Sequence, residues 1–223
     1  MTYFISDIHG EYELFCRLLD KIKFSDNDVL IVLGDMIDKG NESIRVLKKI
    51  YPLDNAICIL GNHEYDFLKF YRAKMRNAID GFDKILSEIQ AYFPNESEPI
   101  TWDLLDWLDG LPSYIATEKY IGVHAGVPLE KDGAIKPIEQ AMTEQLVYDR
   151  NFKNPTTFVN DRRTVLYGHT PTSYLNGTGK IIAYPRKDGS GYSRVYLDTG
   201  VYLTGIMSCF CFESGSCFYV QRH

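Results

Sequence analysis

The residues of this 223-residue chain that could support chemistry are grouped around its histidines. Four of the five histidines lie beside or near a glycine, and each of these four follows a stretch that is typical of a β-strand. Imidazole, carboxylate and amide oxygen are suitable ligands for divalent ions such as Mn, Fe and Zn. The residues that follow predicted strands in this way are Asp7, His9, Asp35, Asn62, His63, His124 and His169.

The elements that must position these side chains alternate between strand and helix in the first 60 residues. Residues 2–6, 28–33 and 56–60 are predicted strands, and the apolar spacing of residues 14–22 and 44–50 predicts helices between them. This order predicts right-handed crossovers and a mainly parallel inner sheet. Because loops at the carboxyl ends of such strands converge on one crevice, residues far apart in the sequence can meet there.

Residues 64–110 are predicted to form a mainly helical segment within the same domain. An apolar stripe that includes Ile79 runs over residues 64–93 with a break expected near Gly81, and a short helix is expected at residues 102–108. The stripe indicates packing against the sheet, with a cap over the site as the alternative.

Beyond residue 112 the chain is predicted to be rich in β-strands. Strands at residues 121–123 and 165–167 each lead into a histidine. Three further strands are expected to close the sheets as antiparallel neighbours, at residues 195–197, 206–212 and 217–220.

The composition is that of an ordinary globular protein, and the length suits one α/β domain spanning residues 1–223. The net charge of -6 argues against a broad surface for nucleic acid or membrane, so neither is an expected partner. The first residues lack the basic start of a signal peptide, which predicts a cytoplasmic location. The five cysteines lack C-x-x-C spacing and are expected to be reduced, mostly buried thiols.

A series of short motifs then matches one enzyme superfamily in order. Ser6 to Gly10 follows G-D-x-H-G except for the initial serine, Gly34 to Gly40 follows G-D-x-x-D-R-G except for Lys39, and Gly61 to Glu64 reads G-N-H-E. The later motifs are Leu146 to Arg150, Leu197 to Gly200 and the segments around His124 and His169. Together they resemble the calcineurin-like metallophosphoesterases, and within them the phosphoprotein phosphatase (PPP) family of the bacterial and phage lambda type.

The resemblance implies a four-layer α/β/β/α sandwich with mixed sheets and a helical segment near the site. It implies a metal-dependent phosphomonoesterase that acts on serine or threonine phosphoproteins or small phosphoesters, with phosphotyrosine also open. Two divalent ions are implied as cofactors, manganese first, with iron, zinc or nickel as alternatives.

The resemblance also implies the metal ligands. Asp7 and His9 are expected to bind the first metal, with Asp35 as the bridge between the two. The second metal is expected to be bound by Asn62, His124 and His169.

The remaining implied roles concern the reaction itself. His63 is the expected general acid, Asp38 orients it, and the substrate phosphate is bound by Arg150, Lys39 and Asn62. Two ions that share a water lower its pKa towards about 7, and the resulting bridging hydroxide attacks phosphorus in line. Lys39 keeps the charge of the usual arginine but loses its planar fork, which puts phosphate affinity in question.

Two alternatives stay open at this point. A hydrolase of diadenosine polyphosphates or other nucleotides could use the same site; Glu64 argues against it, since the symmetrical dinucleotide enzymes typically carry aspartate there. The other alternative is a catalytically inactive binding module on the same fold, which the presence of His63 and all expected ligands disfavours.

Overall fold

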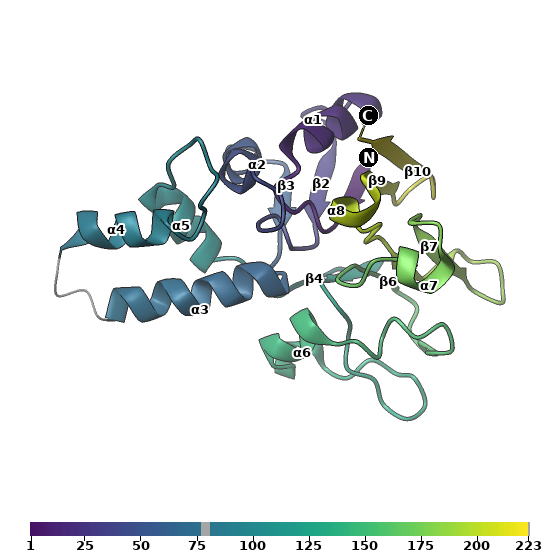
Figure 1. The fold of residues 1–223 in the computed structure, drawn as a ribbon. Coiled ribbons are helices and arrows are strands. Elements are labelled where there is room, and N and C mark those ends of the chain that lie inside the picture. Colours follow the sequence, from purple (N-terminus) through teal and green to yellow (C-terminus); the bar gives the residue numbers. More distant parts are fainter. Residues whose placement is uncertain (77–80, 223) are drawn as a thin grey trace.

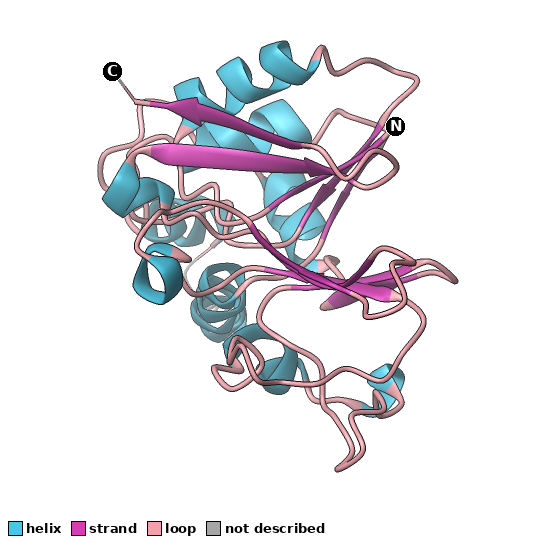
Figure 2. Ribbon diagram, turned by 90° about the vertical axis from the view of Figure 1, so that its right-hand side faces the viewer, coloured by secondary structure: helices cyan, strands magenta, loops and turns pink. Residues whose placement is uncertain are grey.

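The structure is a computed structural model that describes residues 1–76 and 81–222, so that Ile79 of the predicted stripe lies outside the described residues. Two five-stranded mixed sheets lie face to face between helices (Figure 2). Three strands of the first sheet run parallel, because α1 (Tyr12–Ile22) and α2 (Ser43–Ile50) provide the crossovers. The order in this sheet is β10 (Cys217–Gln221), β9 (Ile206–Cys211), β1 (Thr2–Ile5), β2 (Val29–Val32) and β3 (Ala56–Cys58).

The second sheet departs from the sequence-based expectation. Its order is β4 (Tyr114–Ala116), β5 (Tyr120–Val123), β6 (Thr164–Tyr167), β8 (Tyr192–Tyr196) and β7 (Ile182–Pro185), and the two edge strands β4 and β7 were not predicted. The strand predicted at residues 195–197 as an antiparallel neighbour overlaps β8, which runs antiparallel to the edge strand β7 but parallel to β6. After β6 the chain passes through α7 (Ser173–Asn176) and runs back along the edge of the sheet as β7, and the β7–β8 hairpin then restores the direction of β6.

Apolar clusters between and outside the sheets hold the layers together. The cluster between the sheets contains Phe4 and Ile31 from the first sheet and Leu166 and Val195 from the second, all of them buried. Outside the first sheet lie α1 and α2. Outside the second sheet lie residues 127–159, which contain two short helices, η1 (Ile138–Gln140) and α6 (Thr143–Tyr148). The predicted four-layer architecture is confirmed, with a fourth layer made mostly of loops.

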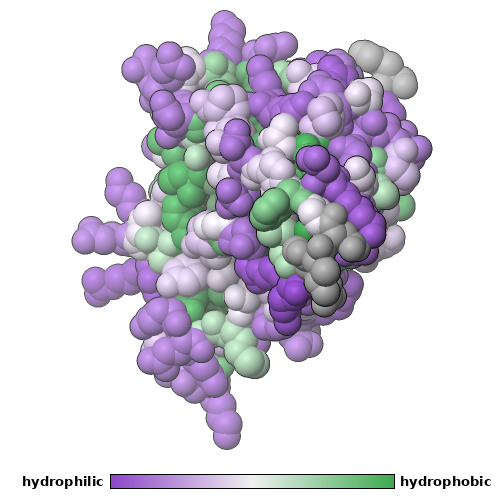
Figure 3. Space-filling view, turned by 90° about the vertical axis from the view of Figure 1, so that its left-hand side faces the viewer, coloured by the Kyte–Doolittle hydropathy of each residue, from purple (hydrophilic) through white to green (hydrophobic). Residues whose placement is uncertain are grey.

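The predicted helical segment forms an arm at one side of the sheets (Figure 1). It consists of α3 (Asn62–Arg76), α4 (Phe82–Gln90) and α5 (Trp102–Asp109). The expected break falls beside Gly81, which precedes α4 with a φ of 90°. The described residues of the apolar stripe pack into the same core as α1 and α2, except Phe82, which is 66% exposed; this favours the packing interpretation over the cap. Viewed from the side of the arm, the surface is mainly hydrophilic, with apolar side chains in separate patches (Figure 3).

Two further expectations concern the whole chain. The five cysteines are free, and Cys58, Cys209 and Cys211 are buried, as predicted. Within residues 1–76 and 81–222, none of the helices has the length and apolar character needed to span a bilayer.

One buried cation links β8 to the loop that follows α6. The Arg194 side chain is fully buried, and its Nη1 atom donates to the carbonyl oxygens of Phe152 at 2.8 Å and Asn154 at 3.3 Å. Its guanidinium also lies 4.1 Å from the centre of the Tyr184 ring. This loop begins with residues 149–151, so Arg194 fixes the position of a segment in which Arg150 is a predicted phosphate ligand.

We expect Arg194→Met to lower the free energy of unfolding by about 2–4 kcal/mol, because buried carbonyl oxygens lose charged donors. Urea denaturation would measure the loss, with Arg162→Met at an exposed position as the matched control. Equal stability of the two variants would contradict the anchoring role.

Candidate metal centre

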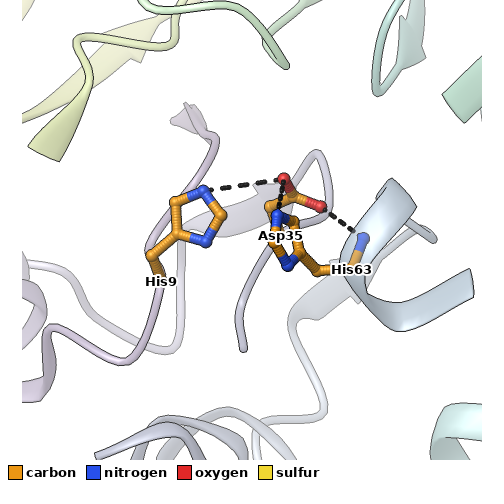
Figure 4. A group of neighbouring side chains, drawn as sticks. All are labelled: His9, Asp35 and His63. Carbon is orange, nitrogen blue, oxygen red and sulfur yellow. Dashed lines mark hydrogen bonds and ion pairs between the residues drawn. The ribbon is translucent and has the colours of Figure 1, made fainter. Parts of the chain in front are cut away.

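The buried carboxylate of Asp35 lies at the centre of the predicted site (Figure 4). Its Oδ2 atom is 3.4 Å from His124 Nε2, 3.6 Å from His9 Nε2 and 3.9 Å from His63 Nε2. Burial opposes ionisation of Asp35, but His124 and His9 outweigh it and hold its pKa well below the usual range. Asp35 therefore presents a fixed negative charge to three imidazoles.

His9 and Asp7 form one side of the centre, in the loop after β1. His9 Nδ1 lies 3.0 Å from the carbonyl oxygen of Ile37, which directs Nε2 toward Asp35. Asp7 Oδ1 is 3.8 Å from His9 Nε2 and is buried without a hydrogen-bond partner among the described residues. A buried oxygen of this kind is the type of ligand that a cation would satisfy.

Asn62, His124 and His169 form the other side. Asn62 Oδ1 lies 3.1 Å from His124 Nε2 and 2.8 Å from His169 Nδ1. His124 Nδ1 contacts the carbonyl oxygen of Leu33 at 2.8 Å, and His169 Nε2 is buried without a partner within the described part of the chain. The two histidines come from the second sheet and Asn62 from the first residue of α3, so this side joins both sheets and the arm.

These side chains fit a pair of divalent ions that share Asp35. Two groups of three side chains each have ligand atoms that all lie within 4.8 Å of one another. One group is His9, Asp35 and His63, and the other is Asp35, His124 and His169. Burial opposes protonation of His124, yet Asp35 raises its pKa to about 10, whereas burial and the neighbouring His124 lower the pKa of His169 to about 3. A metal would replace the proton on His124, because only the neutral imidazole is a ligand.

His63 and Asp38 are paired, as the sequence analysis predicted. His63 Nδ1 is 2.7 Å from Asp38 Oδ2, and the Tyr92 hydroxyl donates to the same oxygen at 3.3 Å. Burial opposes protonation of His63, but the Asp38 hydrogen bond raises its pKa. The backbone N–H of His63 donates to Asp35 Oδ1 at 3.0 Å, so the imidazole is fixed beside the metal ligands while its side chain stays 24% exposed.

Glu64, a residue with no predicted structural role, lies at the core of the site. Its carboxylate is fully buried and accepts N–H bonds from Asp35 at 2.7 Å and Gly61 at 2.9 Å through Oε2. Oε1 accepts from Met36 at 2.7 Å and Ile37 at 3.1 Å. Burial raises the pKa of Glu64 to about 7, while the Asp35 and Gly61 N–H groups favour the carboxylate. Glu64 is the last residue of the G-N-H-E motif, but only the fold shows which backbone N–H groups it accepts hydrogen bonds from.

Asp198 and Ser6, which have no predicted role, lie near Asp7. The buried Asp198 carboxylate accepts the Gly200 N–H at 2.7 Å, and its pKa is raised by burial and by the charge of Asp7. Ser6, which replaces the glycine of the motif, donates its hydroxyl to Asp7 Oδ2. A Cβ at Gly168 would come within 2.0 Å of the Ser6 hydroxyl oxygen, so that glycine leaves room for the serine.

The backbone at the site is unusual. Seven described residues other than glycine have a left-handed backbone, with φ between 48° and 75°, and only Lys23 among them lies outside the predicted site. This conformation costs about 1 kcal/mol or more for a residue with a Cβ, and such costs cluster at functional sites. The six site residues are Asp7, His9, Asp35, Asp38, Lys39 and His169.

The two predicted cationic phosphate ligands differ in position. Lys39 Nζ lies 2.8 Å from His9 Nε2, inside the centre. Arg150 is exposed in the loop after α6 and makes no hydrogen bond or ion pair with the residues described here. Its charge still reaches the centre, since it adds to the burial and the His124 charge that lower the pKa of His169.

We expect Glu64→Gln to lower the free energy of unfolding by about 2–3 kcal/mol, because a side-chain amide would face buried N–H donors. Urea denaturation would measure the loss against Glu118→Gln, a change of the same type at an exposed residue. A Glu64 variant as stable as the control would show that the four N–H bonds contribute little.

Comparisons with known proteins agree with this geometry. Among curated relatives, the symmetrical bis(5'-nucleosyl)-tetraphosphatase of Buchnera aphidicola subsp. Acyrthosiphon pisum (strain 5A) is 32% identical over 157 residues, covering 68% of this chain and 53% of the relative. The enzyme of that name from Wigglesworthia glossinidia brevipalpis is 37% identical over 129 residues, covering 56% of this chain and 44% of the relative. The chain thus spans about half the length of the curated relatives it matches.

Solved structures share the fold at low sequence identity. A structure described as that of a candidate diadenosine tetraphosphatase has a TM-score of 0.73 and 20% identity, covering 100% of this chain and 93% of that chain. A mutant cold-active protein tyrosine phosphatase has a TM-score of 0.58 and 15% identity, covering 99% of this chain and 80% of that chain. The calcineurin-like phosphoesterase family model matches residues 2–198. This chain therefore belongs to the calcineurin-like phosphoesterase family.

Proposed function

We propose that this chain is a metal-dependent hydrolase of dinucleoside tetraphosphates that divides diadenosine tetraphosphate into two molecules of ADP. The observation that carries the proposal is the 32% identity with a symmetrical bis(5'-nucleosyl)-tetraphosphatase over 68% of this chain. This substrate class was the alternative in the sequence analysis, and the comparisons favour it over the protein-phosphatase interpretation.

The position of Glu64 explains why the motif argument for a protein phosphatase is weak. The Glu64 side chain is fully buried and its carboxylate is occupied by backbone N–H groups of two turns. It faces the scaffold rather than the surface to which a substrate binds. Glu64 therefore holds the two turns together, and its presence does not distinguish one substrate class from another.

The proposed ligands follow the two sides of the centre. We assign Asp7, His9 and Asp35 to one cation, and Asp35 with Asn62, His124 and His169 to the other. The assignment is supported by the closeness of Asp35 to His9, His124 and His169, by the contacts of Asp7 with His9 and of Asn62 with His124 and His169, and by the unpartnered Asp7 Oδ1 and His169 Nε2 atoms. When bound, the cations supply Lewis acidity and lower the pKa of water.

His63 is the proposed donor of the proton that the leaving group requires. Asp38 accepts the hydrogen bond from Nδ1, which leaves Nε2 directed toward Asp35 and the substrate. The attacking water gives up one proton to solvent as its oxygen bonds to phosphorus, the P–O bond to the second nucleoside diphosphate breaks, and the leaving oxygen takes the proton of His63, which solvent then restores. Lys39, Arg150 and the Asn62 amide are the proposed contacts to the phosphate oxygens.

The substrate test compares diadenosine tetraphosphate with a phosphoserine peptide and p-nitrophenyl phosphate, each with Mn²⁺. We expect the highest kcat/KM for the dinucleotide, ADP as its sole nucleotide product by ion-exchange chromatography, and loss of every activity with a chelator. A higher kcat/KM for the phosphopeptide would restore the protein-phosphatase interpretation. Inactivity on all three substrates, with metal bound, would support the binding-module alternative.

A second test addresses His63. We expect His63→Asn to lower kcat for the phosphoserine peptide by roughly 100-fold or more, and for diadenosine tetraphosphate by less, because an alkoxide needs a proton more than a phosphate leaving group does. Metal content, measured by inductively coupled plasma mass spectrometry, should stay that of the wild type. Equal losses on the two substrates would count against proton donation by His63.

A further inference from the structure

Lys39 occupies a position that a metal would need. The carbonyl oxygen of Ile37 lies 3.0 Å from His9 Nδ1 and can only accept, so Nδ1 carries the ring proton. His9 Nε2 then has one lone pair, which points toward Asp35. The ammonium group of Lys39 lies 2.8 Å from Nε2 and uses this lone pair as its acceptor.

From this geometry we infer that Lys39 competes with the divalent cation for His9. One lone pair cannot serve an ammonium group and a metal ion at once, and two positive charges a few ångströms apart repel each other. A cation that enters between Asp7, His9 and Asp35 must therefore displace the Lys39 ammonium. Within the described residues, Lys39 makes no hydrogen bond to Asn62, His124 or His169, so competition for a ligand lone pair concerns His9, while the other side senses only the charge of Lys39.

The displaced Lys39 ammonium has alternative partners outside the His9 contact. Lys39 is an exposed residue, and its Nζ atom also lies 4.2 Å from the centre of the Tyr202 ring, so solvent and an aromatic ring are within reach of the ammonium besides His9. A phosphate group in the site offers the ammonium an anionic partner in place of the imidazole. Phosphate and metal then favour each other's binding, because each stabilises the arrangement in which Lys39 has left His9.

This inference rests on the metal dependence in the proposed function but not on the nucleotide preference. The lysine would make the His9 side a weaker, exchangeable metal site that is filled most readily when a phosphoester is present. The arginine found in the family motif has a planar guanidinium group with a different reach and shape, so this coupling belongs to the lysine in this chain.

Isothermal titration of the metal-free full chain with Mn²⁺ tests the competition directly. Lys39→Met keeps the length of the stem without the charge, and we expect it to tighten the weaker of two binding events about 10-fold or more, and the tighter one by less. Lys48→Met is the control, since Lys48 lies outside the centre, where its Nζ atom is 2.7 Å from Glu98 Oε2. Inorganic phosphate should tighten the weaker event more in the wild type than in Lys39→Met.

Several outcomes would overturn the inference. Unchanged or weaker Mn²⁺ binding by Lys39→Met would show that Lys39 does not compete, and so would an equal effect of phosphate on both proteins. Because Lys39 has a φ of 69°, Lys39→Asn serves as a second variant that suits this backbone and cannot reach His9. It should tighten Mn²⁺ binding in the same way. None of these titrations depends on which phosphoester is hydrolysed, so failure of the proposed substrate leaves them interpretable.

Discussion

The carboxylate of Glu64 is the constraint on which the rest of the centre depends. It accepts hydrogen bonds from N–H groups of two turns, one after β2 and one after β3, and so fixes the spacing between Asp35 and the start of α3. Asn62 and His63 are the first two residues of that helix. A single buried anion therefore positions the shared carboxylate, one proposed metal ligand and the proposed acid with respect to each other.

Close packing between the two sheets provides the second half of the geometry. A Cβ at Gly122 in β5 would come within 2.8 Å of a Leu33 methyl carbon at the end of β2, so the sheets approach closely at the strand ends that carry the ligands. The carbonyl oxygen of Leu33 also contacts His124 Nδ1. The distance between Asp35 and His124 is thus set by the packing of the layers and the backbone rather than by flexible side chains.

The sequence predicts the strand ends and the ligand types well, because His9, His63, His124 and His169 each follow an apolar strand and parallel strands share one edge. It does not predict the β4 and β7 edge strands, which have only 3 and 4 residues and are therefore too short to show a clear alternating pattern. The direction of β8 depends on the return path through β7, a long-range pairing that local patterns do not contain. The contacts of Glu64 and Lys39 likewise depend on loops that meet only in the folded chain.

The left-handed backbone at six site residues means that an alanine scan of this chain changes backbone strain as well as side-chain chemistry. Replacing Asp7 or Asp38 by alanine removes a functional group and also places a Cβ-bearing residue with poor tolerance for this conformation in a strained turn. Lost activity in an alanine scan would then combine chemistry with local misfolding. Asparagine, which tolerates positive φ, separates the two at the aspartates, and a comparison of glycine with alanine, both of which lack the functional group, isolates the backbone contribution. A residue whose glycine variant outperforms its alanine variant is one whose conformation, as well as its side chain, builds the site.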